Sequence, residues 1–127
     1  MADETYPDDL RYHPEHDWAR LDGDHAVFGI TWYAQDSLGD IVAFLPPAVG
    51  DAVAAGAVYG ELESVKAVSE IIAPLAGEIV EVNPLVVEGP EVVNEDPYGS
   101  GWLIKVKLAD PAAAAELLDA AAYRATL

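Results

Sequence analysis

Short apolar runs separated by turn-forming residues are the feature that most restricts how this chain can fold. Two of these runs, residues 57–62 and 68–72, follow one another with only a few residues between them. Such a pair predicts a β-hairpin with Lys66 at its tip. The turn contains no Asn-Gly or Asp-Gly, and Val65 would resist the positive φ that a two-residue type I′ turn demands. We therefore expect a type I turn or a slightly wider loop, from which Lys66 projects into water.

Other runs predict the remaining strands. They are expected at residues 18–21, 25–30, 41–45, 78–82 and 102–108. The first two form a second hairpin, and in its second arm Ala26, Phe28 and Ile30 share one face by the period of two. In the last strand, Lys105 and Lys107 are expected on the solvated face of an edge strand.

Two helices are expected. Thr31 is a suitable N-cap for a short helix over residues 32–38, which the following glycine would end. Asp110 and Pro111 offer an N-cap and a first-turn proline for an Ala-rich C-terminal helix over about 111–123.

The remaining segments complete the predicted fold. Residues 83–101 carry Pro and Gly in irregular order and predict an ordered loop, whereas residues 1–10 are polar and expected to lie loosely on the domain. Many short strands with little helix favour a mainly β fold, either a β-sandwich or a flattened barrel. The length predicts one domain spanning residues 1–127.

The charge excludes several classes of partner. The chain has 23 acidic residues against six Lys and Arg, a formal net charge of −17. So negative a surface opposes binding to nucleic acids and to anionic membranes. Two explanations compete, namely an acidic docking surface for partners and an adaptation of the whole surface to high salt. The acids are spread along the chain and lysine is scarce, which favours the second, a halophilic adaptation.

No targeting segment is visible. No apolar run approaches the roughly 20 residues that cross a bilayer, and the acidic N-terminus lacks the basic and apolar regions of a secretory signal. We therefore expect no membrane partner and a cytoplasmic protein. The chain has no Cys, which excludes disulfides and thiol catalysis.

No set of residues predicts catalysis or metal binding. His13, His16 and His25 lack the spacing of a helical metal site, and the carboxylates are too numerous for an acid–base pair to stand out. What remains is Lys66, the only lysine before Lys105. Taken alone, it is most simply a surface lysine in a turn. Its isolation on a small β scaffold also suits covalent attachment of a cofactor.

An ordered set of motifs gives the sequence a resemblance to a known family. The motifs are His16-Asp17-Trp18, Gly29-Ile30-Thr31, Leu38-Gly39-Asp40-Ile41-Val42, Glu63-Ser64-Val65-Lys66-Ala67-Val68, Val80-Glu81-Val82-Asn83, Asn94-Glu95-Asp96-Pro97-Tyr98 and Gly101-Trp102-Leu103-Ile104-Lys105. Over roughly residues 11–123 the chain resembles the H proteins of the glycine cleavage system, a family of lipoyl-carrying shuttles.

That resemblance implies a fold and a site. The fold would be a lipoyl-domain-like β-sandwich of two sheets, also called a barrel-sandwich hybrid, with lipoic acid covalently bound to Lys66. Glu63 and the family's two flanking glycines, here Gly50 and Gly77, would present the hairpin. Family members hold the loaded arm in a surface cleft, and the matching positions in this chain are Glu15, Asp17, Ile30 and Glu70. Asp17 stands where Glu is usual in the family.

The resemblance also implies a function. The protein would be a non-catalytic carrier that shuttles the aminomethyl group of glycine between enzymes. Its partners would be a pyridoxal-phosphate-dependent glycine decarboxylase, a tetrahydrofolate-dependent aminomethyltransferase, dihydrolipoyl dehydrogenase and a lipoylating enzyme.

Two other functions stay open at this point. One is a lipoyl relay protein, or a lipoyl domain that serves 2-oxoacid dehydrogenases. The Val65-Lys66-Ala67 context differs from the Asp-Lys-Ala that is usual in those domains, and from the Met-Lys-Met of biotin carriers. The other is an interaction module without any prosthetic group.

Overall fold

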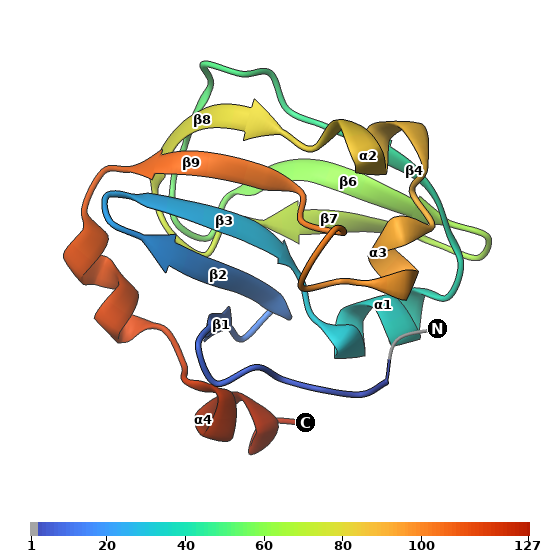
Figure 1. Ribbon diagram of the computed structural model, residues 1–127, viewed down its shortest axis with the longest axis horizontal. Helices are drawn as coiled ribbons and strands as arrows, with labels where there is room; N and C mark the ends of the chain where they lie inside the picture. Colours follow the sequence, from blue (N-terminus) through green and yellow to red (C-terminus); the bar gives the residue numbers. More distant parts are fainter. Residues whose placement is uncertain (1–2) are drawn as a thin grey trace.

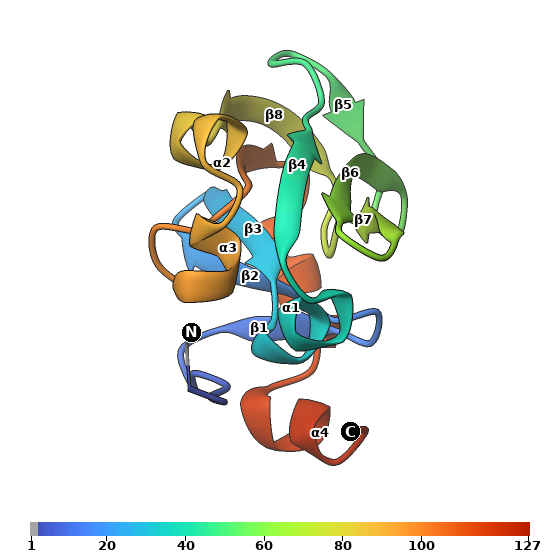
Figure 2. The same ribbon diagram turned by 90° about the vertical axis from the view of Figure 1, so that its right-hand side faces the viewer.

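The computed structural model describes residues 3–127 and consists of two antiparallel sheets (Figure 1 and Figure 2). The larger sheet has the strand order β1-β2-β3-β9-β8-β5, and the smaller has the order β4-β6-β7. The strands are β1 (Arg11–His13), β2 (Asp17–Asp22), β3 (His25–Ile30), β4 (Ile41–Leu45), β5 (Ala52–Val53), β6 (Val58–Ser64), β7 (Val68–Ile72), β8 (Gly77–Val82) and β9 (Ile104–Leu108). The helices are α1 (Trp32–Leu38), α2 (Pro84–Glu88), α3 (Val92–Glu95), the 3-10 helix η1 (Pro111–Glu116) and α4 (Ala120–Arg124). The expected mainly β, two-sheet architecture is confirmed.

The main core lies between the sheets, because successive side chains of a strand point to opposite faces. On β3 the inward residues are those predicted, Ala26, Phe28 and Ile30, and all three are buried. The cluster around them draws on both sheets and includes Leu62, Ile71, Ile79, Ile104 and Val106. Burial of this shared apolar surface holds the two sheets together.

Strand β9 lies in the middle of the larger sheet, so the expectation of an edge strand is wrong. It pairs with β3 on one side and with β8 on the other. Lys105 and Lys107 nevertheless point away from the core, and Lys105 Nζ lies 3.7 Å from a Glu81 carboxylate oxygen. The alternating pattern reveals which face of a strand is solvated, but it does not reveal how many neighbours the strand has.

Residues 3–10 pack against the domain, so the expectation that they lie loosely is wrong for the part that the structure describes. Tyr6 and Leu10 are buried, and the Tyr98 hydroxyl donates to the Thr5 carbonyl oxygen at 2.7 Å. A second, mainly aromatic cluster packs at the β1–β2 edge of the larger sheet. It comprises Tyr6, Leu10, Tyr12, Trp18, Tyr98, Ala120 and Tyr123. Burial of two large side chains, Tyr6 and Leu10, is therefore enough to hold this otherwise polar segment on the domain.

The single C-terminal helix expected over about 111–123 is two short helices instead. Asp110 caps the first, as predicted, but Leu117 is extended, with φ −77° and ψ 159°. Leu118 and Tyr12 then exchange two backbone hydrogen bonds of 2.8 and 2.9 Å. Because these bonds extend the pairing of β1, they compete with helix hydrogen bonds at this point. Asp119 caps the second helix, α4.

Helix α1 has the predicted bounds and caps. Thr31 Oγ1 accepts the backbone N–H of Ala34 at 3.3 Å, and Gly39 ends the helix with a φ of 76°. The region 83–101 is more regular than the expected loop, since it contains α2 and α3. The start of α2 has an ordinary helix-start signal, an Asn83 N-cap followed by Pro84. The irregular spacing of Gly and Pro in this region concealed that signal.

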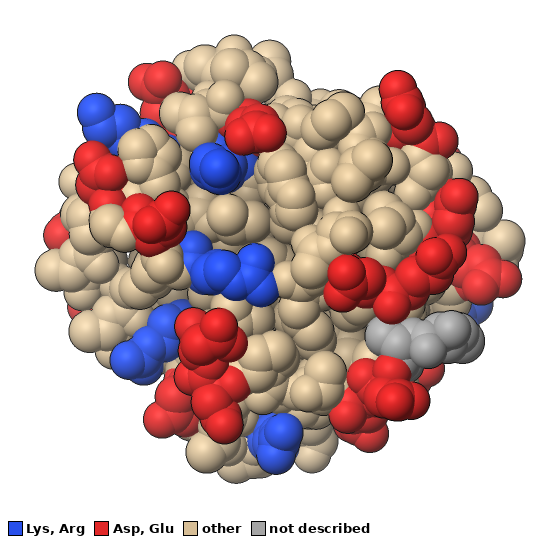
Figure 3. All heavy atoms as spheres, viewed as in Figure 1, with Lys and Arg blue, Asp and Glu red and all other residues tan. Residues whose placement is uncertain are grey.

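The acidic side chains are distributed rather than paired. Figure 3 shows them around the rim of the face that the larger sheet presents, with Lys and Arg between them. Two ion pairs are formed within residues 3–127, Asp24 with His25 and Glu81 with Lys105. Within the same range, each helix is too short or too polar to cross a membrane.

Candidate functional site

Strands β6 and β7 form the predicted hairpin, and Lys66 lies in its turn. The backbone N–H of Ser64 donates to the Ala67 carbonyl oxygen at 2.8 Å. The Ser64 hydroxyl oxygen accepts the N–H groups of Lys66 and Ala67 at 3.3 and 3.1 Å. Neither Val65 nor Lys66 has a positive φ, which confirms that the turn is not of type I′. One serine side chain therefore closes a turn whose central residues need no special backbone.

The turn is also tied to the rest of the domain, while Lys66 is exposed. The Val65 N–H donates to the Asp40 carbonyl oxygen at 3.1 Å, which joins the turn to the segment after α1. The side chain of Lys66 runs beside Gly39, where a Cβ would lie 3.6 Å from Lys66 Cε. Within residues 3–127 Lys66 forms no ion pair. A fixed backbone thus presents a long side chain with an accessible amine.

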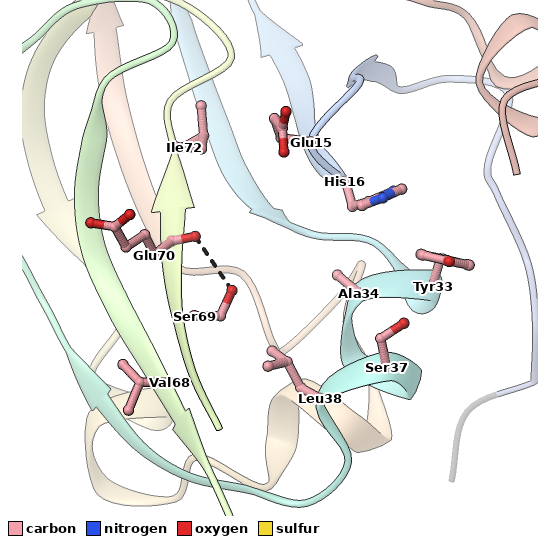
Figure 4. A pocket seen from close by; sticks show the side chains of 10 residues that line it. All are labelled: Glu15, His16, Tyr33, Ala34, Ser37, Leu38, Val68, Ser69, Glu70 and Ile72. Atoms are coloured by element: carbon pink, nitrogen blue, oxygen red, sulfur yellow. Dashed lines mark hydrogen bonds between the residues drawn. The ribbon is translucent and has the colours of Figure 1, made fainter. Parts of the chain in front are cut away.

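A cleft of about 510 Å³ opens beside this turn (Figure 4). Its first wall is α1, its second is β7, and its third is the turn between β1 and β2. The lining residues are Tyr33, Ala34, Ser37 and Leu38 from the first wall, Val68, Ser69, Glu70 and Ile72 from the second, and Glu15 and His16 from the third. Because Leu38 directly precedes Gly39, the Lys66 side chain lies at the α1 end of the cleft.

Two of the four cleft residues expected from the sequence line this cleft. Glu15 and Glu70 are both exposed and belong to different walls. Figure 4 shows the Glu70 carboxylate turned toward β6 and away from α1, while its carbonyl oxygen accepts the Ser69 hydroxyl at 3.4 Å. The wall residues therefore supply negative charge, with no Lys or Arg among them.

The other two expected residues, Asp17 and Ile30, lie behind the cleft. They are 2% and 5% exposed and face each other as paired residues of β2 and β3. The Asp17 carboxylate accepts the backbone N–H of Ile72, a residue of the β7 wall. Burial raises the pKa of Asp17 well above its ordinary value. Burial, and after it the charge of Asp17, raises the pKa of Tyr59, whose hydroxyl has no hydrogen-bond partner within residues 3–127.

The three residues expected to present the hairpin are not gathered at one place. Glu63 is half-buried in β6, next to the turn, and opposes Val68 of β7. Gly50 has a φ of 99°, and its N–H donates to the Ile79 carbonyl oxygen at 2.7 Å. A Cβ on Gly77 would overlap the carbonyl oxygen of Lys107. The two glycines therefore shape the β5–β8–β9 end of the larger sheet.

His16 also lines the cleft, although no sequence pattern predicts a role for it there. It has a φ of 73°, and its ring packs against Tyr33 at a centroid distance of 4.5 Å. Its Nδ1 lies 2.7 Å from the hydroxyl of Tyr123, and desolvation lowers its pKa. No sequence spacing signals a contact between residues 107 positions apart. The helical period does place Tyr33, Ala34, Ser37 and Leu38 on one face of α1, which could have identified that wall.

Comparisons with known proteins agree with this arrangement. The family described as "Glycine cleavage H-protein" matches residues 10–127. A glycine cleavage system H protein of Bacteroides thetaiotaomicron is 53% identical over 97% of this chain and 98% of its own length. One of Synechococcus elongatus is 52% identical over 94% of this chain and 93% of its own length. The crystal structure of a glycine cleavage system H protein from Mycobacterium marinum superposes with a TM-score of 0.86, at 42% identity over 94% of this chain and 96% of that one.

Proposed function

Since this chain belongs to the glycine cleavage H-protein family, and is therefore a non-catalytic lipoyl carrier of the glycine cleavage system, we propose that Lys66 is the residue that bears its lipoyl group. The observation that carries the proposal is the exposed position of Lys66 in a protruding turn. The other two lysines, Lys105 and Lys107, lie on β9 in the middle of the larger sheet. A turn can enter the active site of a modifying enzyme, whereas a central strand cannot.

The residues around Lys66 fit such a group. Attachment through an amide removes the ammonium charge of Lys66 and leaves a long, mostly apolar arm. Val65 and Val68, which flank it, are 69% and 60% exposed and offer the arm apolar surface. When bound, the lipoyl group supplies the dithiol chemistry by which the aminomethyl group of glycine is carried between enzymes.

We further propose that the cleft shelters the loaded arm. Lys66 lies at the α1 end of the cleft, and Glu15 and Glu70 belong to its other two walls. The Glu70 carboxylate, which is turned toward β6 in this structure, would swing toward the arm by rotation of its exposed side chain. An ammonium-type group at the end of the arm would donate charge-assisted hydrogen bonds to these carboxylates, each contributing about 1.5–3 kcal/mol. Asp17 and Ile30 support the cleft from behind, since Asp17 fixes the backbone of Ile72.

The carrier works with the other proteins of the glycine cleavage system. We infer that these are a glycine decarboxylase, an aminomethyltransferase and dihydrolipoyl dehydrogenase, with a lipoylating enzyme that loads Lys66. A tethered arm raises the effective concentration of its cargo at each of these enzymes without releasing it.

We also infer that the protein works at high salt. Twenty-three acids face six Lys and Arg, and the ion pairs formed within residues 3–127 involve two of those acids. Most of the negative charge is therefore left to be screened by ions rather than by neighbouring bases.

The exchange of labelled bicarbonate into glycine, catalysed by a purified glycine decarboxylase, tests this function. Wild-type protein that has been lipoylated should support the exchange, and Lys66→Arg should not, because arginine is not acylated by the same chemistry. Lys107→Arg is the matched control, and it should behave as wild type. Exchange supported by Lys66→Arg would disprove the assignment of the site. A lipoylated wild type that supports no exchange would favour the 2-oxoacid dehydrogenase alternative.

A further inference from the structure

Two walls of the cleft are joined through one hydroxyl group. The hydroxyl oxygen of Tyr123 lies 2.7 Å from Nδ1 of His16, in the turn between β1 and β2. The same oxygen lies 2.8 Å from Oγ1 of Thr31, the N-cap of α1. A backbone hydrogen bond of 3.0 Å from Thr31 to His16 completes a small closed network. Tyr123 itself is fully buried in α4 and lines no part of the cleft.

One set of directions for these hydrogen bonds gives every proton in the network an acceptor. The Thr31 hydroxyl oxygen already accepts the Ala34 N–H, and its proton remains free to be donated to Tyr123. We assign the directions so that Tyr123 donates its own proton to Nδ1 of His16, which is then the neutral tautomer with its proton on Nε2. Desolvation favours the same neutral form.

We propose that Tyr123 is a positioning residue of the arm cleft, which sets the distance between the β1–β2 turn and α1 by holding His16 and Thr31 together. The proposal rests on the proposed function, in which the cleft receives the arm from Lys66. His16 needs such support, because a φ of 73° is unfavourable for a residue with a side chain. The β7 wall is fixed separately, by the β6–β7 hairpin.

The support comes from the C-terminal segment of the chain. The ring of Tyr123 stacks on Tyr12 at 4.8 Å and meets Tyr6 edge-on at 5.5 Å. These contacts hold α4 on the larger sheet, so that its tyrosine hydroxyl reaches the cleft walls from behind. The C-terminal helix thus gains a role in the carrier that its distance from Lys66 in the sequence does not suggest.

Tyr123→Phe removes the hydroxyl and keeps the ring. The matched control is Tyr12→Phe, which removes a buried hydroxyl from the same cluster, one that donates to the Pro7 carbonyl oxygen at 2.7 Å.

Two quantities are measured for each variant. The first is the ¹⁵N chemical shifts of the His16 ring at one neutral pH, which report its tautomer. The second is the rate at which lipoylated protein, loaded with glycine and glycine decarboxylase, loses the aminomethyl group after the decarboxylase is removed.

The expected results separate positioning from a general loss of stability. Tyr123→Phe should shift the His16 ring toward a mixture of tautomers and speed the loss by about threefold to tenfold, the range that one net hydrogen bond gives. Tyr12→Phe should leave both quantities as in wild type. Equal loss rates for Tyr123→Phe and wild type would overturn the proposal, as would equal effects of the two variants. If wild type itself cannot be loaded, the proposed function fails instead.

A second variant covers the case in which Tyr123→Phe does not fold. His16→Asn removes the same hydrogen bond from the cleft side, and asparagine tolerates the positive φ better than most residues. It should also lose the aminomethyl group faster than wild type. A wild-type rate in His16→Asn would overturn the proposal.

Discussion

The Asp17→Asn variant should gain stability relative to wild type as the pH rises from acid to neutral. Asp17 is 2% exposed, and burial raises the pKa of its carboxyl group well above the ordinary value. An acid of this kind binds its proton more tightly in the folded protein than in the unfolded chain. Raising the pH from the unfolded pKa, about 3.9, through the folded pKa therefore removes stability, and the full penalty is present above both values.

The magnitude follows from linkage. Each unit by which the folded pKa exceeds the unfolded one costs wild type about 1.4 kcal/mol of unfolding free energy once the pH is above both. Asn does not ionise, so Asp17→Asn escapes that penalty. Its side-chain oxygen can still accept the Ile72 N–H.

Urea unfolding at fixed ionic strength, in steps from about pH 4 to pH 9, measures the effect. The difference in unfolding free energy between Asp17→Asn and wild type should rise with pH in favour of the variant and then level off. Asp22→Asn, at the exposed end of the same strand, is the matched control and should show no such rise. A flat or falling difference for Asp17→Asn would refute the reasoning that the burial of this carboxyl opposes its ionisation.

Three further predictions concern the cleft, the larger sheet and the charge. Glu15→Gln and Glu70→Gln should each leave lipoylation intact but speed the loss of the aminomethyl group by about tenfold to a hundredfold, because each removes a carboxylate that holds this group. Unchanged half-lives of the loaded protein would show that these carboxylates do not hold the aminomethyl group. Gly77→Ala should lower the unfolding free energy measured in urea by about 1–3 kcal/mol, because the added Cβ would overlap the backbone of the central strand β9. An unchanged midpoint of urea unfolding would contradict this prediction. The thermal midpoint should rise steeply over the first molar of potassium chloride, since repulsion among 23 acids is screened, and a flat response would leave the acidity to be explained by partner docking. Sulfate should raise the midpoint further than chloride does, because it also strengthens apolar burial.

The sequence predicts well what local chemistry determines. The period of two identified the inward residues of β3, Thr31 and Gly39 set the bounds of α1, and Val65 excluded the type I′ turn at Lys66. Each of these depends on a few neighbouring residues, whose preferences the tertiary structure does not oppose.

What the sequence does not predict depends on contacts between distant segments. The C-terminal helix is interrupted because Leu118 pairs with Tyr12, and β9 is central because β3 and β8 flank it. In the cleft, the family resemblance pointed to Glu15 and Glu70, which line it, and to Asp17, which lies behind it. His16 was missed because its role comes from Tyr123, which no local pattern connects to it.

The most direct test of the central claim is to locate the lipoyl group by mass spectrometry. The protein, lipoylated in cells or by a purified lipoylating enzyme, is digested, and its peptides are searched for the mass of an added lipoyl group. The group should be found on the peptide that contains Lys66, with Lys105 and Lys107 unmodified. A lipoyl group on either of those lysines, or none on Lys66 under conditions that modify a known carrier, would contradict the claim that this turn presents the lipoyl-bearing lysine.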